Sequence, residues 1–174
     1  MFDKLIELLV SWAEYLLPIG IIADYQEGVL LRWGKFKRVL KPGRYFKYPL
    51  IDQVMEQHIT VTTLSLPAQS LYTQDKTNIV VKGVIKYKIA DIKVFMLEVF
   101  DATDAIADMT QAIIKEVIIN STLDNCLGNE IDNTITKKAR VEAKKWGVEI
   151  KQVTLTDIAP IRSYRLISDT IKPT

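Results

Sequence analysis

The stretch LPAQSLYTQDKTNIVVKGVIKYKI, residues 66–89, decides the fold of this chain. In its second half, apolar side chains recur at every second position, at Ile79, Val81, Ile85, Tyr87 and Ile89. Lysines occupy positions that alternate with these, at Lys82, Lys86 and Lys88. Successive side chains of a strand point to opposite faces, so this pattern predicts a long β-strand with one buried face and one solvated face.

A turn and a second strand precede this long strand. The segment TQDKTN at residues 73–78 is typical of a turn, because Asp and Asn side chains can bond nearby backbone groups. Pro67 has no N–H to give to a β-ladder and therefore ends the strand before it. The sequence thus predicts a strand, a tight reversal and a long strand on which the rest of the chain can pack.

Length and composition exclude several classes of protein. The chain has 174 residues, 48% of them apolar, which suits one domain with a small appendage. Its net charge of +2 gives no overall preference for nucleic acid. Cys126 and His58 are the only cysteine and the only histidine, so an internal disulfide is excluded. A structural zinc site or a Cys–His catalytic pair is disfavoured for the same reason, and Cys126 is expected to be a small buried apolar side chain.

Residues 2–17 form an amphipathic segment. On a helical wheel, Asp3, Lys4, Glu7, Ser11 and Glu14 fall in one arc of roughly 100° and apolar side chains fill the rest. The following Pro18 ends the helix. Acidic residues interrupt the apolar run, which argues against a secretory signal and a transmembrane span. The pattern favours a helix in the membrane interface; the alternative is a helix docked on the domain or on a second copy. The residues expected to insert are Phe2, Leu5, Ile6, Leu9, Trp12, Leu16 and Leu17.

A basic stretch with interleaved aromatic residues follows. Between Glu27 and Asp52 there are seven basic residues and no acidic one. Such a stretch can bind anionic lipid headgroups, at about 1 kcal/mol per well-placed cation. It can also bind nucleic acid, or be the solvated face of a β-meander. The lipid interpretation is the most economical, because the stretch directly follows the amphipathic segment. The candidate contacts are Arg32, Lys35, Lys37, Arg38, Lys41 and Arg44.

The remaining segments predict an α+β domain of antiparallel strands with two packed helices. Further strands are expected at residues 19–24, 29–32, 45–48 and 59–66, and Gly28, Gly34 and Pro42-Gly43 divide the first part of the chain into hairpins. One helix starts after Asp101 and runs to about residue 120, with Ile106, Met109, Ala112, Ile113 and Val117 at helical spacing. A second helix is expected at 129–146, with Ile131, Ile135, Ala139 and Ala143 as its buried stripe.

The end of the second helix and the strand after it complete the prediction. Gly147 stands where a left-handed residue ends a helix. A strand follows at 148–155, and a slip in its apolar phase between Ile150 and Val153 predicts a bulge. The organisation is therefore an amphipathic helix at 1–18, one domain at 19–160, and a short tail at 161–174 that could begin another helix.

Taken together, these segments resemble the SPFH domain, also called the band-7 domain, of stomatin, prohibitin, flotillin and HflK/C. The resemblance covers about residues 19–160 and is greatest to the stomatin and HflK/C branch. It rests on QEGV at 26–29, RWGK at 32–35, KPGRYF at 41–46, Pro49, LPAQ at 66–69, TQD at 73–75, the strand 78–89, TLD at 122–124, WGV at 146–148, Val153, Asp157 and Ile158. Family members usually continue into a long coiled coil, but this chain has no sustained heptads up to Thr174.

The resemblance implies a membrane-associated scaffold that oligomerises, and it implies neither catalysis nor a cofactor or metal. Expected partners are membrane lipids and further copies of the chain. The alternative function is regulation of a membrane protease or channel, through the carboxylates of Asp101, Asp104 and Asp108 or through the helix at 129–146. Nucleic-acid binding through the basic stretch is the weaker alternative. An enzyme is disfavoured, since Asp75 and Ser121 have no partner at useful spacing and His58 has no evident carboxylate beside it.

Overall fold

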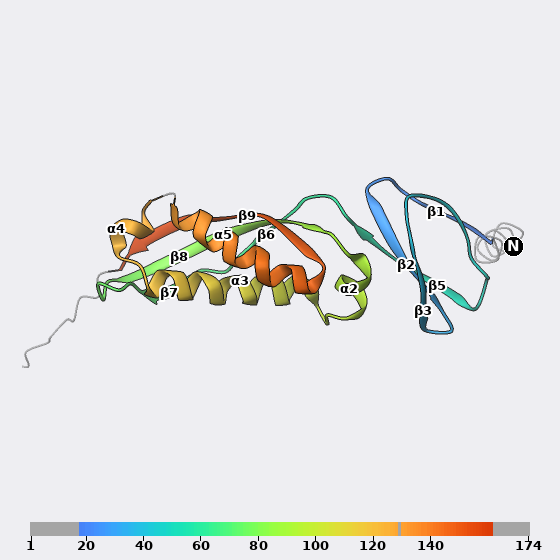
Figure 1. Cartoon of the computed structure of the whole chain (residues 1–174), viewed down its shortest axis with the longest axis horizontal. Coiled ribbons are helices and arrows are strands. Elements are labelled where there is room, and N and C mark those ends of the chain that lie inside the picture. Colours follow the sequence, from blue (N-terminus) through green and yellow to red (C-terminus); the bar gives the residue numbers. More distant parts are fainter. Residues whose placement is uncertain (1–17, 129, 162–174) are drawn as a thin grey trace, which may run out of the picture.

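The computed structural model describes residues 18–128 and 130–161, which form a small and a large lobe (Figure 1). The small lobe consists of β1 (Ile19–Ile22), β2 (Gln26–Arg32), β3 (Lys35–Leu40), β4 (Gly43–Phe46) and β5 (Asp52–His58). The large lobe consists of β6 (Thr62–Ser65), β7 (Gln69–Tyr72), β8 (Asn78–Ile89), α2 (Ile92–Leu97), α3 (Ala102–Ile119), α4 (Leu123–Cys126), α5 (Glu130–Ala143), the 3-10 turn η1 (Lys144–Trp146) and β9 (Val148–Pro160).

Two predicted segments lie outside the described residues. One is the amphipathic segment, with the side chains expected to insert into a membrane: Phe2, Leu5, Ile6, Leu9, Trp12, Leu16 and Leu17. The other is the tail from residue 162 onwards. Both therefore remain predictions.

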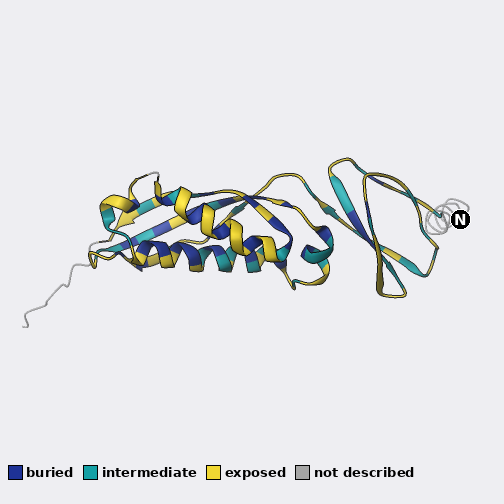
Figure 2. Cartoon of the chain, in the orientation of Figure 1, coloured by how far each residue is buried: buried dark blue, intermediate teal, exposed yellow. Residues whose placement is uncertain are grey.

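The long strand β8 organises the large lobe, as its sequence predicts. It pairs antiparallel with β6 and β7 on one edge and with β9 on the other. Helices α3 and α5 lie along one face of this sheet (Figure 1). The face that they cover carries the predicted apolar residues, all buried: Ile79, Val81, Ile85, Tyr87 and Ile89. The three lysines of the other face are exposed, and buried positions gather between the helices and the sheet (Figure 2).

Strand β9 contains the predicted bulge and a second one. Lys86 pairs with Gln152 and Tyr87 with Ile150, so Lys151 has no partner on β8. A second shift beside Gly83 leaves Thr156 without a partner. Each bulge adds one residue to the strand and keeps its apolar side chains on the core face. The strand also runs to residue 160, five residues beyond its predicted end at residue 155, because pairing with β8 continues where the apolar pattern no longer marks a strand.

Helix α5 covers the outer edge of β9 with polar side chains one turn apart. Thr136 accepts from the Val153 N–H at 2.9 Å and donates to its carbonyl at 3.3 Å. Asp132 accepts from the Leu155 N–H at 3.1 Å. Arg140 donates to the carbonyls of Ile150 and Lys151. An uncovered strand edge would offer its backbone groups to another chain, and here the helix satisfies them instead.

Both predicted helices are confirmed, with differences in detail. In α3 the residues Ile106, Ile113 and Val117 are buried as predicted, but Ala112 is exposed. The buried stripe turns instead through Ile114 and Ile118, because α3 packs against both the sheet and α5. Helix α5 ends at residue 143 and tightens into η1, and the predicted left-handed terminator Gly147 has φ 70°.

The sequence pattern does not predict β3, β5, β7 or α2. Strand β5 has only two apolar residues and becomes a strand by pairing along the whole of β2. Helix α2 is six residues long and its Asp91 cap accepts from the N–H groups of Lys93 and Val94. It packs against β2, where Val29 joins the core of the large lobe. These additions bring the described helices above the two that were expected.

Candidate functional site

The predicted basic contacts belong to the small lobe, and five of the six are exposed. These five are Lys35, Lys37, Arg38, Lys41 and Arg44, on β3, on the turn after it and on β4. Within residues 18–128 and 130–161 none of them forms an ion pair. Their charges are therefore available to an anionic surface from outside the lobe.

The sixth residue, Arg32, forms an ion pair within the small lobe. Its guanidinium donates to both carboxylate oxygens of Asp52, at 2.7 and 3.0 Å, and lies 4.5 Å from the centre of the Tyr48 ring. The Asp52 side chain is 0% exposed and also accepts from the Tyr48 N–H at 2.9 Å. The hydrogen bond from Arg32 is the main reason that the pKa of Asp52 falls to about 2. A bidentate pair of this kind fixes geometry as well as charge.

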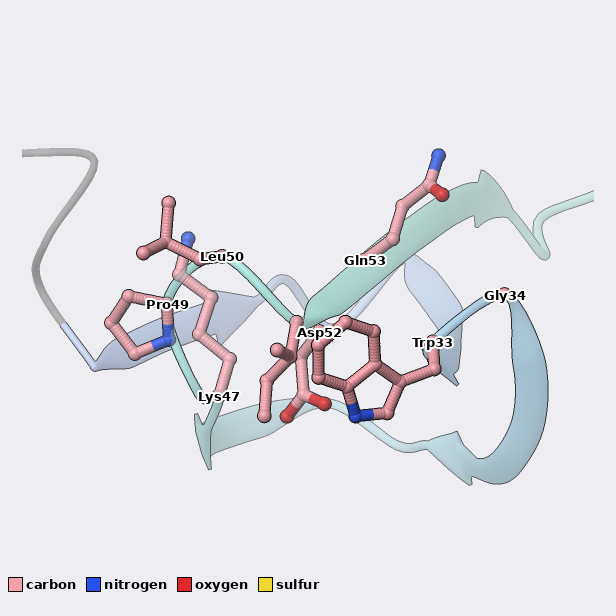
Figure 3. A pocket seen from close by; sticks show the side chains of 8 residues that line it. Trp33, Gly34, Lys47, Pro49, Leu50, Asp52 and Gln53 are labelled. Atoms are coloured by element: carbon pink, nitrogen blue, oxygen red, sulfur yellow. The ribbon is translucent and has the colours of Figure 1, made fainter.

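This ion pair holds the loop between β4 and β5 against the turn between β2 and β3. The Asp52 N–H donates to the Tyr48 carbonyl and the Trp33 N–H donates to the Ile51 carbonyl, both at 3.0 Å. Trp33 comes from the turn and Leu50 from the loop, on either side of Asp52 (Figure 3). They line a hollow of about 450 Å³ with Lys47 and Pro49.

The two-stranded sheet β1–β4 carries apolar side chains on both faces, and on the outer face exposed Arg44 lies opposite Ile21. Inward, Ile22 is buried with Leu30 and Leu40, and the ring of Tyr45 packs over Gly20. Outward, Ile19 and Ile21 are exposed, and Ile19 pairs across the sheet with exposed Phe46. These outward residues were not among the sequence candidates. Successive residues of a strand point to opposite faces, so Ile19 and Ile21 lie on one face and Ile22 on the other. This arrangement was the sequence signal that both faces carry apolar side chains.

The chain enters this sheet at Pro18. The Lys47 N–H donates to the Pro18 carbonyl at 2.7 Å, which extends the β1–β4 ladder by one bond. The hollow lined by Lys47 and the point where residues 1–17 join the domain are therefore neighbours.

The other sequence candidates have structural roles in the large lobe or lie apart. Asp75 accepts from the Leu123 N–H at 2.9 Å, which links the motifs at 73–75 and 122–124. Asp101 caps α3 by accepting from the Asp104 N–H, and Cys126 is buried, with its thiol pKa raised by that burial. His58 stacks on Tyr25 with ring centres 5.2 Å apart.

The described residues hold neither a cluster of metal ligands nor a membrane-spanning helix. In residues 18–128 and 130–161 no three His, Cys, Asp or Glu side chains are grouped as metal ligands. Over the same ranges, no helix has the length and apolar character needed to cross a bilayer.

Comparison with known proteins identifies the family of this α+β domain. The profile described as "SPFH domain / Band 7 family" matches residues 21–166. The chain belongs to the SPFH domain / Band 7 family, as the sequence motifs predict.

Several relatives have similar sequences over most of the chain. An uncharacterised protein of Archaeoglobus fulgidus is 27% identical over 157 residues, covering 88% of this chain and 63% of the relative. A putative band 7 family protein of Acanthamoeba polyphaga mimivirus is 26% identical, covering 81% of this chain and 47% of the relative. Stomatin-1 of Caenorhabditis elegans is 25% identical, covering 80% of this chain and 43% of the relative. The chain thus spans about half the length of these relatives.

Proposed function

We propose that this protein is a non-catalytic scaffold bound to a membrane surface. The observation that carries the proposal is the concentration in the small lobe of five exposed cations that form no ion pair with the described residues; residues 1–17 join this same lobe at Pro18. Membership of a family that contains stomatins supports the same function. The anchor consists of two parts, the predicted interfacial helix and the basic residues, because either signal alone gives only marginal attachment.

Flotation with vesicles tests the basic part of this anchor. The full chain is mixed with anionic vesicles and compared with a variant carrying Lys35→Gln, Lys37→Gln and Lys41→Gln. At about 1 kcal/mol per cation, this variant should bind roughly 100-fold more weakly, and the difference should shrink as salt screens the charges. A full chain that stays in the soluble fraction would falsify the proposal.

A matched control removes the same charge from the large lobe. The variant with Lys82→Gln, Lys86→Gln and Lys88→Gln loses three exposed lysines from the outer face of β8. It should bind vesicles as the parent does. Equal weakening of both variants would mean that net charge, rather than the basic residues of the small lobe, determines the binding.

Assembly into homo-oligomers is part of the same proposal. A scaffold acts by presenting many copies on one membrane patch, and the resemblance to the stomatin and HflK/C branch implies such assembly. The mass of the particle extracted from membranes in mild detergent distinguishes a single chain of 19.8 kDa from an assembly. A particle of monomer mass at the concentration found in membranes contradicts the oligomeric part of the proposal.

A second candidate function is restraint of a membrane protein such as a protease or channel. Phe100, between α2 and α3, is 99% exposed and lies beside the Asp101 cap. A fully exposed phenylalanine near carboxylates is suited to anchor a partner in a pocket. Pull-down from membranes with the parent chain and a Phe100→Ala variant tests this function. A partner that the parent enriches and the variant loses supports it, and equal recovery by both excludes Phe100 as the anchor.

A further inference from the structure

Exposed apolar side chains are concentrated on the small lobe, on the outer face of β1 and β4 and at the turn and loop beside Asp52. Ile19 and Ile21 lie on the outer face of β1, and Phe46 pairs with Ile19 on β4. The Tyr48 ring meets the edge of Phe46 at 5.2 Å. Leu50 and Trp33 line the hollow beside Asp52, and the Arg32 guanidinium that binds Asp52 lies against the Tyr48 ring. We call this surface the apolar band and define it as Ile19, Ile21, Trp33, Phe46, Tyr48 and Leu50.

The two tips of the band have backbone conformations that their side chains do not favour. Trp33 has φ 52° and Leu50 has φ 70°. Trp33 and Gly34 form a two-residue hairpin turn in which both φ angles are positive, and such turns prefer Asn-Gly. A bulky residue in the left-handed region is disfavoured. Yet these side chains remain 75% and 78% exposed, so packing among the described residues does not account for their conformations.

Hydrogen bonds fix the backbone at both tips of the band. Asp52 is buried between them and is held by Arg32 from β2 and by the Tyr48 N–H from the loop. The Trp33 N–H bond to the Ile51 carbonyl ties the turn to the loop directly. A backbone that is already in place loses little conformational freedom on binding. The band is thus a preorganised contact surface.

The chemistry around the band indicates which partner it contacts. Trp and Tyr side chains are enriched at the level of lipid headgroups, where their rings meet the apolar region and their polar atoms meet water. Lys47 lines the hollow, and Lys35 follows the Trp33 turn directly. The Lys47 N–H also joins the band to Pro18, where the predicted membrane helix ends. Charge and connectivity therefore favour an anionic bilayer over a protein partner.

We propose that the apolar band inserts into the interface of an anionic bilayer, with Trp33 and Leu50 deepest. This inference rests on the proposed membrane function and extends it, because a rigid second contact fixes the orientation of the domain on the membrane. The predicted helix at 2–17, acting alone, would leave the domain free to rotate about its junction.

Substitutions that suit the backbone separate insertion from folding. Trp33→Asn and Leu50→Asn remove the apolar side chains and place at each tip a residue that tolerates positive φ. Each should keep or raise the melting temperature of the full chain and weaken binding to anionic vesicles by about ten-fold. The control is Leu127→Asn, an exposed leucine just after α4, at the far end of the large lobe (Figure 1). The control should leave binding unchanged, and unchanged binding of both tip variants would overturn the inference.

Fluorescence of Trp33 gives a second and independent readout. In the full chain with Trp12→Phe and Trp146→Phe, Trp33 is the only tryptophan. On vesicles containing lipids brominated along their acyl chains, its emission should shift to the blue and be quenched. If the double substitution unfolds the chain, the spectral difference between the parent and Trp33→Asn on the same vesicles supplies the measurement.

The outcomes separate this inference from the proposed function. Binding of the parent chain with an unquenched Trp33 overturns the inference and leaves the membrane function intact. A blue shift that depends on protein concentration without vesicles assigns the band to a contact between copies, and it also overturns the inference. Failure of the parent chain to bind vesicles overturns both.

Discussion

The two lobes use their apolar residues in opposite ways. In residues 18–58 only four apolar side chains are buried, and one of these, Val29, belongs to the core of the large lobe. The same residues carry eight of the sixteen large apolar side chains that are exposed in the described part of the chain. The large lobe buries its apolar residues between a sheet and two helices (Figure 2). Stability is therefore concentrated in the large lobe, and the small lobe leaves much of its apolar surface exposed among the described residues.

The largest expected effect is a core truncation in the large lobe. Ile85→Ala removes a fully buried side chain from the centre of β8 and should reduce the free energy of unfolding by about 3–5 kcal/mol. The matched change Leu30→Ala in the three-residue core of the small lobe should cost about 2 kcal/mol, because fewer neighbours surround it. Urea denaturation measures both, and hydrogen exchange should show that Leu30→Ala opens only the small lobe. Equal global losses would contradict the contrast between the lobes.

Two glycines, one in each lobe, give the next largest expected effect on stability. Gly147 and Gly34 have nearly the same φ, 70° and 72°. A Cβ at Gly147 would lie 2.4 Å from the Asp91 carbonyl oxygen, whereas one at Gly34 would meet nothing within 4 Å. Gly34→Ala should cost about 1 kcal/mol through backbone strain alone. Gly147→Ala adds the clash and should lower the melting temperature clearly further, and a thermal scan in which the two variants coincide would show that the large lobe relaxes at no cost.

The ion pair of the small lobe predicts a pH dependence. Because the folded pKa of Asp52, about 2, lies below its unfolded value of about 3.9, its stabilisation is complete above the unfolded value. It is lost as the pH falls from there through about 2. In Arg32→Met, burial without the guanidinium raises the folded pKa, so the small lobe should lose structure at a higher pH. Carboxyl NMR titration and hydrogen exchange against pH measure this change.

An exposed ion pair of the large lobe is the control for that experiment. Lys93 and Glu98 approach to 3.5 Å with both side chains accessible to solvent. Such pairs contribute little to stability, so Lys93→Met should leave the acid profile unchanged. A shift as large as that of Arg32→Met would mean that burial of Asp52 is not the cause.

The smallest expected effect has the opposite sign. Trp33→Asn should increase the free energy of unfolding by about 1 kcal/mol, because Asn-Gly suits a turn with two positive φ angles. Denaturation in the absence of vesicles measures it. A loss of stability would show that the indole packs within the lobe, and the strain would then have no bearing on an outside contact.

Many features of the large lobe could be predicted from local sequence. The alternation at 79–89 predicted the buried and solvated faces of β8, and the phase slip after Ile150 predicted a bulge in β9. Gly147 was predicted as a left-handed terminator. These features follow from the period of the backbone and from the lack of a Cβ, which are properties of a few neighbouring residues.

Tertiary structure decided the features that join distant parts of the chain. In the sequence, Arg32 is one more cation of a basic stretch. Only the pairing of β2 with β5 brings it against Asp52. The exposure of the apolar band likewise could not be predicted, because an apolar residue in a strand is usually buried. Sequence alone determined where the chain alternates, turns and bends. Which side chains are buried and which remain exposed depended on how the strands pair, since burial is a property of neighbours that the chain brings together only on folding.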